Sequence, residues 1–296
     1  MLAAEVTDLA STWLADRVEM ASVEVRERLD ALAAVAEKVI VGLDFDGTLA
    51  PIVEDPTQAH IHPDAPQVLI ELAQRVLAVA VITGRPARQA LALGGLEEVG
   101  DAFAAVGKDL HVFGQYGNER WSSTQRRVVG ARPPHGLASF ERELPRLLRR
   151  LDAADAYVED KQLAVAVHTR RMDDPAGAFA RLLPELRELA SRHGLVVEPG
   201  RSVIEVRSGG VHKGQAVRTL AEELGGGGFL FAGDDLGDLE AFDAVSELAD
   251  QGLPTLLVCS SSGEENALVA RADVVVDGPA GVLELLAELG RSISRR

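Results

Sequence analysis

Cysteine and aromatic residues are scarce in this chain of 296 residues. A single cysteine, Cys259, excludes an intramolecular disulfide and any zinc site built from several thiolates. Aromatic residues make up 4% of the chain, although 47% of it is hydrophobic. The hydrophobic cores of one large or two smaller domains must therefore consist mainly of alanine, leucine and valine. Cys259 ends the apolar run 256–259, so we expect a buried small side chain and not a reactive thiol.

Basic residues are also in short supply. The 30 lysines and arginines face 46 acidic residues, which gives a formal net charge of −16. Such a charge repels nucleic acid and anionic membranes, so we expect neither as a partner. A phosphorylated substrate would be repelled as well, unless local cations or a bound metal offset the charge.

Long apolar runs are absent from the sequence. The sequence contains no run of about 18 apolar residues, the length that a membrane-spanning helix needs. Glu5 and Asp8 stand where a secretory signal would be basic and then apolar. Together with the single cysteine, these features predict a cytoplasmic protein, and they leave its oligomeric state open.

Short apolar runs alternate with helical patterns along much of the chain. Residues 39–43 and 79–82 contain only apolar residues and glycine, and 66–76 between them suits a helix. Apolar runs without polar alternation predict strands buried on both faces, and strand, helix, strand predicts a parallel pair. We expect further strands at 111–113, 229–232, 256–259 and 274–276, and further helices within 5–37 and at 88–93, 213–224 and 283–289.

The pattern changes after Trp121. Shorter apolar segments with hairpin-like spacing predict a small α+β insert with an antiparallel sheet, formed by strands near 157–158, 163–168, 196–197 and 203–206 and a helix at 175–193. The predicted fold class is α/β, a Rossmann-like parallel-sheet core with an inserted α+β domain. The expected divisions are an N-terminal helical segment 1–36, a core of 37–121 and 208–296, and the insert 122–207.

Two carboxylates follow the first buried run. Asp44 and Asp46 are spaced i and i+2 and precede Gly47. They can serve one reaction only if the backbone curls directly after Phe45, which a glycine permits. One carboxylate could then attack phosphorus while the other transfers protons. An acidic turn after a strand explains the same residues, so this segment alone leaves both interpretations open.

Polar residues also follow two other buried runs. Thr83 comes after 79–82, and the segment 234–238 with its three aspartates comes after 229–232. In an open parallel sheet, ligands bind at the carboxyl ends of the strands. Oxygen donors without a cysteine or histidine cluster indicate a hard cation, and Mg²⁺ is the usual one beside a phosphate. The alternatives are a strand-end cap at Thr83 and a helix N-terminus at 234–238. Lys213, at the start of the expected helix 213–224, is equally typical of a solvated helix residue.

Four segments resemble, in order, the motifs of the haloacid dehalogenase superfamily of phosphohydrolases: DFDGTL at 44–49, ITGR at 82–85, HKG at 212–214 and GDDLGD at 233–238. The resemblance implies a haloacid dehalogenase-like core and a phosphorylated aspartate. It implies that Asp44 is the nucleophile and that Asp46 protonates the leaving oxygen and then activates water. Thr83 would donate a hydrogen bond to the phosphate, and Lys213 would balance charge.

The same resemblance implies a Mg²⁺ site. Asp44, the backbone carbonyl of Asp46 and Asp234 would hold the ion, with Asp235 and Asp238 as further ligands or as residues that support them. A phosphate monoester approaching several carboxylates needs such cations in any case, because its charge would otherwise repel theirs.

A narrower resemblance, from about Val39 onward, is to the trehalose-6-phosphate phosphatase family. It is carried by LAPIVEDPTQA at 49–59, GQYGNE at 114–119, VEDK at 158–161 with VHTR at 167–170, and EVR at 205–207. It implies that the insert is a cap, or lid, over a sugar phosphate. The implied substrate-binding residues are Gly84, Arg85, Glu119, Lys161, His168, Arg170, Glu198 and Glu205. Several of these are equally typical of exposed charges on a cap.

The two resemblances together imply Mg²⁺-dependent hydrolysis of trehalose 6-phosphate to trehalose and phosphate through phosphorylated Asp44. Gln115 and Tyr116 stand where the family often has Asn and His, which bears on the sugar contacts. The alternatives are a phosphatase of another sugar phosphate or glycoside, a non-catalytic sugar-phosphate sensor, and a phosphomutase. In each case the partner is a small-molecule sugar phosphate.

Overall fold

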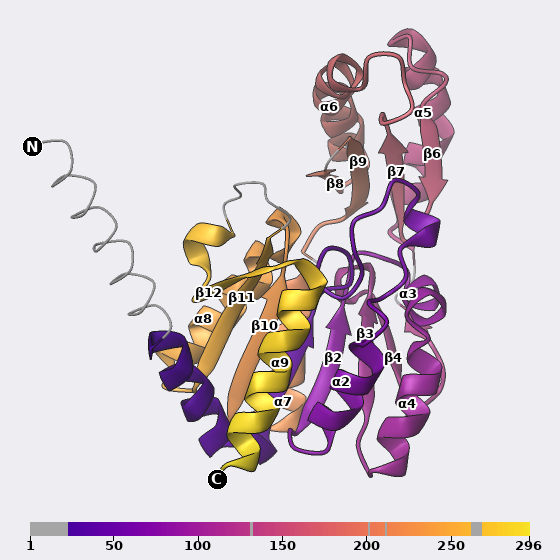
Figure 1. Ribbon diagram of the computed structural model, residues 1–296. Coiled ribbons are helices and arrows are strands. Elements are labelled where there is room, and N and C mark those ends of the chain that lie inside the picture. The colour runs from indigo at the N-terminus through magenta and orange to yellow at the C-terminus, as the bar shows by residue number, and fades with distance from the viewer. Residues whose placement is uncertain (1–22, 131–132, 201, 211, 262–267) are drawn as a thin grey trace, which may run out of the picture. The chain divides into compact units, whose positions relative to one another are not determined.

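The computed structural model describes residues 23–130, 133–200, 202–210, 212–261 and 268–296. Its chain forms two compact units (Figure 1), which we call the core unit, Met1–Val128 with His212–Arg296, and the insert unit, Val129–Val211. Part of the expected N-terminal helical segment, residues 1–22, lies outside the described residues, and residues 23–34 are helical.

The insert unit begins and ends a few residues later than the expected bounds of 122 and 207. The Ser123 hydroxyl accepts a hydrogen bond from Leu110 N–H and donates one to Asp109, and Val128 packs against the largest hydrophobic cluster of the core unit. At the other boundary, Ser208 still pairs with Leu195 inside the insert. Contacts of Ser123 and Val128 with the core therefore set the first boundary, and strand pairing of Ser208 sets the second.

A mostly parallel sheet forms the centre of the core unit. Its strand order is β12-β11-β10-β1-β2-β3-β4-β5, and all neighbours from β12 to β3 are parallel, whereas β4 runs antiparallel to β3. The strands are β1 Val39–Leu43, β2 Ala78–Ile82, β3 Leu110–Gly114, β4 Glu119–Ser122, β10 Gly228–Gly233, β11 Thr255–Ser261 and β12 Val274–Asp277. The last strand in this order, β5 Val129–Gly130, consists of the first two residues of the insert unit.

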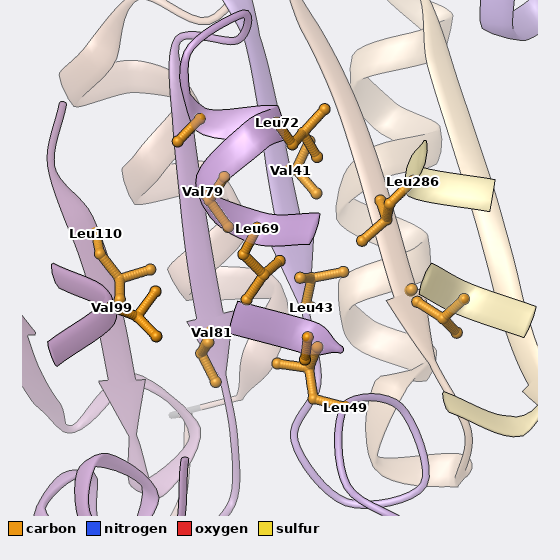
Figure 2. Packing of buried hydrophobic residues seen from close by; sticks show 14 of the residues in the cluster. Val41, Leu43, Leu49, Leu69, Leu72, Val79, Val81, Val99, Leu110 and Leu286 are labelled. Atoms are coloured by element: carbon orange, nitrogen blue, oxygen red, sulfur yellow. The ribbon is translucent and has the colours of Figure 1, made fainter. Parts of the chain in front are cut away.

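Helices cover both faces of this sheet, so β1, β2 and β3 are buried along their whole length. One face packs against α2 Ala65–Ala73, α3 Ala87–Gly94, α4 Leu96–Ala105 and α9 Gly278–Ser294. Figure 2 shows Leu69 and Leu72 of α2 and Leu286 of α9 near the strand residues. The other face packs against α7 Lys213–Leu224 and α8 Leu239–Asp250. Short 3₁₀ turns lie at η1 Ala36–Lys38, η2 Pro56–Gln58, η3 Gln115–Gly117, η4 Leu236–Asp238 and η5 Val269–Arg271.

Gly42 allows the large aromatic side chains of β10 to lie against β1. A Cβ at this position would lie 2.9 Å from the Phe231 ring and 3.1 Å from the Phe229 ring. Two of the few aromatic residues of the chain thus fill the space beside a glycine, while smaller side chains fill most of the remaining core.

The insert unit contains a four-stranded antiparallel sheet in the order β6-β7-β9-β8. Its strands are β6 Tyr157–Asp160, β7 Ala164–His168, β8 Leu195–Gly200 and β9 Val203–Ser208. The helices α5 Leu137–Arg150 and α6 Pro175–Arg192 share a hydrophobic cluster with one face of this sheet. Val165 and Val206 belong to that cluster, so the residues that alternate with them point to the opposite face.

Three helices were not expected from the sequence: α4, α5 and α8. α5 carries many charges and an internal proline, Pro145, although its buried residues follow the helical period at Leu137, Phe140, Leu144, Leu147 and Leu148.

The sequence predicted a strand at 274–276 that is buried on both faces. The strand is present, but the expected burial was wrong. β12 is an edge strand whose residues alternate between half-buried and exposed, because only one side of it has a partner strand.

Cys259 is buried, and burial raises the pKa of its thiol to about 11, so the thiol stays protonated at neutral pH. Among the described residues, none of the helices has both the length and the apolar character that a membrane span needs.

Candidate active site

The carboxyl ends of β1, β2 and β10 meet at one edge of the core sheet. Leu43 at the end of β1 pairs with Val81 of β2 on one side and with Ala232 of β10 on the other. Asp44 is therefore the next residue after an aligned row of three, and its N–H donates to the carbonyl of Ala232 at 2.9 Å. Thr83 follows two residues after Val81, so the strand register alone brings these motifs together.

Lys213 links two buried carboxylates at this edge. Its ammonium lies 2.7 Å from Asp44 Oδ1 and 2.8 Å from Asp238 Oδ1, and its side chain is 4% exposed. Lys213 is the first residue of α7, which packs on the face of the sheet behind β1. The N-terminus of α7 thus places one ammonium between Asp44, which follows β1, and Asp238, which lies in the segment after β10.

The charges of this cluster strongly perturb one another. Burial alone would lower the pKa of Lys213, but the charges of Asp238, Asp44 and Asp235 outweigh burial and hold it well above 10.5. Burial raises the pKa of Asp44 well above its usual range, even though Lys213 acts in the opposite direction. Lys213 therefore stays charged, and the cluster holds more carboxylates than one ammonium can neutralise.

Asp44, Asp234 and Asp238 each offer a carboxylate oxygen, and these oxygens lie within 4.8 Å of one another. Burial, followed by the charge of Asp44, raises the pKa of Asp234 to about 10. When all three carboxyl groups are ionised, one ammonium leaves two negative charges without a counter-charge, and the raised pKa values reflect this excess. A hard divalent cation fits both the oxygen donors and this charge.

Asp238 and Asp235 also organise the loop after β10. Asp238 Oδ2 accepts hydrogen bonds from the N–H groups of Asp234 at 3.1 Å and Asp235 at 3.3 Å. Asp235 is exposed, and its carboxylate accepts from Gly237 N–H at 2.9 Å, which caps η4. The two residues form a capping box, so the sequence alternative of a helix start is part of the same structure.

Asp46 lies apart from the lysine cluster and has its own cation. Arg85 Nε donates to Asp46 Oδ2 and Arg85 Nη2 donates to Asp46 Oδ1, both at 2.6 Å. Arg85 Nη1 donates to the carbonyl of Pro56 at 2.9 Å, and the guanidinium carbon lies 5.4 Å from the centre of the Phe45 ring. The sequence interpretation of Arg85 as a substrate ligand did not include this pairing.

The backbone curl after Phe45 that both aspartates require is present. Gly47 has φ of +72°, and the N–H groups of Leu49 and Ala50 donate to the carbonyl of Phe45. A Cβ on Gly47 would lie 2.0 Å from Asp234 Oδ2, so the Asp234 carboxylate lies directly against this glycine. The buried Ser260 hydroxyl donates to the Gly47 carbonyl at 2.6 Å. Sequence reasoning missed Ser260, although it directly follows the apolar run 256–259; in the structure it lies within β11 Thr255–Ser261.

Hydrogen bonds from the chain after β3 hold the Thr83–Arg85 loop. Tyr116 N–H donates to the Thr83 carbonyl at 2.9 Å, and Gln115 N–H donates to the Arg85 carbonyl at 2.8 Å. A Cβ on Gly84 would lie 2.9 Å from the Tyr116 ring, so the ring packs on this glycine. Thr83 is buried, and its hydroxyl accepts from Arg85 N–H at 3.1 Å.

Glu119 contacts the protein backbone in this arrangement. Its carboxylate accepts from the N–H of Ala87, the first residue of α3, at 2.6 Å, and Glu119 is 9% exposed. Gln115 Nε2 lies 3.5 Å from the other oxygen of this carboxylate. Glu119 was expected to bind substrate. In the structure its carboxylate instead accepts a hydrogen bond from the N-terminus of α3, next to the Thr83–Arg85 loop.

The expected residues of the insert gather on one face of its sheet. Lys161 follows β6 and lies 2.5 Å from Glu205 Oε2, and Arg207 Nη2 lies 3.0 Å from Glu198 Oε2. These side chains alternate with those that pack against α5 and α6, so they belong to the helix-free face of the sheet.

The remaining two expected residues of the insert lie at the end of β7. His168 Nε2 lies 2.9 Å from Glu159, and the His168 ring lies beside that of Tyr157. Arg170 lies just beyond β7 in a turn and is exposed. The structure therefore places Lys161, Glu198 and Glu205 in ion pairs on one face of the insert sheet, with His168 in contact with Glu159 at its end.

Comparisons with known proteins agree with this architecture. The structure is similar to that of the C-terminal domain of trehalose-6-phosphate phosphatase from C. albicans, with a TM-score of 0.70 and 21% identity, covering 90% of this chain and 96% of that one. At this level of identity the likeness establishes the fold.

Two curated relatives resemble the sequence. A glycosyl hydrolase of uncharacterised function from Mycobacterium tuberculosis is 35% identical over 217 residues, which cover 69% of this chain. The trehalose-phosphate phosphatase of Mycobacterium bovis (strain BCG) is 29% identical over 268 residues, which cover 88% of this chain. The matches span 15% and 63% of the lengths of these relatives.

A family-level comparison covers most of the chain, including the two acids after β1, the Thr83–Arg85 loop, Lys213 and the loop after β10. The trehalose-phosphatase family matches residues 42–104 and 144–274, and the chain belongs to this family.

Proposed function

We propose that this chain hydrolyses trehalose 6-phosphate to trehalose and inorganic phosphate. Membership of the trehalose-phosphatase family supports the substrate. The observation that carries the chemistry is the buried contact of Asp44 with Lys213, at 2.7 Å, within reach of two further carboxylates. A structural ion pair needs only one acid, whereas this cluster has the excess negative charge that a catalytic metal site requires.

Asp44 is the nucleophile in this proposal. An oxygen of its carboxylate forms a bond to phosphorus while the bond between phosphorus and the sugar oxygen breaks, and the departing oxygen takes a proton from Asp46. Asp46 then removes a proton from water, whose oxygen attacks phosphorus and releases Asp44 as a carboxylate. Asp44 is 4% exposed and held by Lys213, so its reactive oxygen has a fixed direction.

Lys213 and Thr83 serve the phosphate. The Lys213 ammonium offsets the charge of Asp44 as the phosphate approaches, which lowers the repulsion between carboxylate and phosphate. The Thr83 hydroxyl accepts from Arg85 N–H, so its own hydrogen can point to a phosphate oxygen. Lys213 is the first residue of α7 and Thr83 directly follows β2, so the core sheet and the helix packed on it determine both positions.

The oxygen donors of Asp44, Asp234 and Asp238 fit Mg²⁺, which we propose as the cofactor. When bound, the ion supplies positive charge that keeps neighbouring carboxylates ionised and offsets the charge of the phosphate. We assign Asp44 and Asp234 as direct ligands. Asp238 already accepts three hydrogen bonds, from Lys213 and from two backbone N–H groups, so it orients Asp234 through the loop.

We assign recognition of the sugar to the helix-free face of the insert sheet. Lys161, His168 and Glu205 there are charged or polar side chains already oriented by partners. Sugar hydroxyls need both donors and acceptors, and a face of paired acids and bases offers both. Arg170 and Glu198 extend the same surface in this proposal.

A phosphate-release assay with a panel of sugar phosphates, with and without Mg²⁺, tests the proposal. We expect the highest kcat/KM for trehalose 6-phosphate and no release without a divalent cation. A clear preference for another sugar phosphate would contradict the substrate. No release from any ester in the presence of Mg²⁺ would indicate a sensor, and accumulation of a bisphosphorylated sugar would indicate a phosphomutase.

The variant Asp44→Asn tests the covalent step. The substitution keeps the size of the side chain but replaces the nucleophilic carboxylate with a neutral amide. We therefore expect no phosphate release, and no phosphorylated protein in samples quenched with acid. Asp250→Asn, an exposed acid at the end of α8, is the matched control and should retain full activity. Turnover that survives Asp44→Asn would exclude phosphorylated Asp44 as an intermediate.

A further inference from the structure

The two acids of the DFDGT segment have separate cations in this structure. Asp44 is paired with Lys213 inside the cluster, whereas Asp46 is paired with Arg85 outside it. The Asp46 side chain is 34% exposed, and that of Arg85 is 9% exposed. A nearly buried guanidinium therefore holds a carboxylate that remains accessible from solvent.

The pairing restricts both the position and the rotation of the Asp46 carboxylate. Nε and Nη2 of Arg85 donate to different oxygens of Asp46, each at 2.6 Å, so the two planar groups lie fork against fork. A single hydrogen bond would leave the carboxylate free to turn about its own axis. Two parallel bonds also fix its rotation, which an ammonium in the place of the guanidinium could not do.

Arg85 is itself held on several sides. Its Nη1 donates to the Pro56 carbonyl at 2.9 Å, and its guanidinium lies over the Phe45 ring. Its backbone N–H donates to the Thr83 hydroxyl at 3.1 Å. Asp46, the η2 turn and the Thr83 hydroxyl thus all hold Arg85 in one position.

We propose that Arg85 is a positioning residue for Asp46, which sets the direction in which Asp46 transfers its proton, and that Arg85 is not primarily a ligand of the sugar phosphate. The inference rests on the proposed function, because it assumes that Asp46 gives a proton to the leaving oxygen. A displacement of about 1 Å in a proton-transfer group can lower a rate about 100-fold, so loss of the fork should lower kcat strongly.

Kinetics of Arg85→Ala and Arg85→Lys test the inference on two substrates. Trehalose 6-phosphate leaves as an alkoxide that needs a proton, whereas para-nitrophenyl phosphate leaves as a stable phenolate. We expect both variants to lower kcat for trehalose 6-phosphate by about 100-fold with little change in KM. The effect on para-nitrophenyl phosphate should be much smaller. Guanidinium ions added to Arg85→Ala should restore part of kcat, which a folding defect would not allow.

A double-mutant cycle separates positioning from binding. In an Asp46→Asn background, Arg85→Ala should have little further effect on trehalose 6-phosphate, because a residue that acts through Asp46 has nothing left to position. A raised KM with unchanged kcat, or an undiminished effect of Arg85→Ala in that background, would overturn the inference. Arg218→Ala removes another fork-to-fork pair, with Glu247 at 2.7 and 2.8 Å, and should leave both activities unchanged.

A crystal structure of Arg85→Ala gives a readout that does not depend on turnover. We expect the Asp46 carboxylate to occupy more than one rotamer, and a single unchanged rotamer would overturn the inference even if the proposed function holds. If the wild-type chain releases phosphate from no ester, the proposed function fails, and with it the catalytic part of this inference. The structural arm would still report whether Arg85 fixes the carboxylate.

Discussion

The Lys213 ammonium lies 2.7 Å from the Asp44 carboxylate, and both side chains are at least nine-tenths buried. Removing one partner of a buried ion pair leaves the other without compensation, which costs about 3–5 kcal/mol. We therefore expect Lys213→Met to lower the free energy of unfolding by about that amount and to abolish phosphate release, measured by urea denaturation and by assay. Lys38→Met, at an exposed position, should change the free energy of unfolding by no more than about 0.5 kcal/mol. Equal stability of the two variants would contradict the prediction.

Gly47 and Gly107 form a matched pair for a test of the site turn. Both have φ of +72°, but a Cβ on Gly47 would collide with the Asp234 carboxylate, whereas a Cβ on Gly107 would meet nothing within 4 Å. Alanine at either position should cost about 1–2 kcal/mol of stability for the left-handed backbone. Only Gly47→Ala should also displace Asp234 and raise the Mg²⁺ concentration that half-maximal activity requires. If both variants keep the wild-type Mg²⁺ dependence, Asp234 is not a ligand.

Asp238 should affect metal affinity through the loop that it holds. Its carboxylate accepts from the N–H groups of Asp234 and Asp235, and the amide of Asp238→Asn can replace only one of its two oxygens. We expect the Mg²⁺ concentration for half-maximal activity to rise about 10- to 100-fold, as for other residues that orient metal ligands. Titration calorimetry with Mg²⁺ gives the same comparison without substrate. Asp250→Asn is the control, and an Asp238→Asn protein with the same affinity as this control would contradict the prediction.

His111 should make the core unit sensitive to mild acid. It is buried in β3, its Nδ1 has no hydrogen-bond partner among the described residues, and burial lowers its pKa below 6.5. Because the unfolded chain then binds the proton more tightly than the folded chain, the free energy of unfolding falls as the pH drops below 6.5. Above that value His111 is neutral in both states and the effect is absent.

Urea denaturation at about pH 5.5 and about pH 7.5 measures this effect. His111→Gln should lose part of the difference in unfolding free energy between the two pH values. His135→Gln, at an exposed position, should keep the full difference. A His111→Gln protein with the same pH dependence as the wild type would show that the imidazole is not the group that titrates.

Lys161 tests the proposed sugar surface. Its ammonium pairs with Glu205 at 2.5 Å on the helix-free face of the insert sheet. A hydrogen bond to a charged group is worth about 1.5–3 kcal/mol, so Lys161→Met should lower kcat/KM for trehalose 6-phosphate about 10- to 100-fold, mainly through KM. Turnover of para-nitrophenyl phosphate, which lacks the sugar, should not change.

Arg150→Ala is the control for Lys161→Met. Arg150 pairs with Glu185 at 2.6 Å in the same unit, but on the helices that cover the other face. It should leave kcat/KM for both substrates unchanged. An equal loss on both substrates in Lys161→Met would indicate a general effect on the protein and would argue against a sugar contact.

Much of the core followed from local patterns. The apolar runs that end before Asp44, Thr83 and Asp234 are β1, β2 and β10, because a strand covered by helices on both faces has no polar alternation. Helices whose apolar period was interrupted by charges or proline, such as α5, were not recognised from the sequence. Their stability depends on packing against a sheet more than on local preference.

The sequence by itself determined which residues stand at the ends of the buried strands, because the order of motifs and strands is a property of the chain. Only the tertiary structure decided which side chains meet. It placed Lys213 between Asp44 and Asp238. It also brought the Glu119 carboxylate to the backbone N–H of Ala87, 32 positions earlier, at the N-terminus of α3. It also gave Asp46 a partner 39 positions away, Arg85. Contacts between residues so distant in the chain depend on strand order, register and burial, and the spacing of residues in one segment does not contain that information.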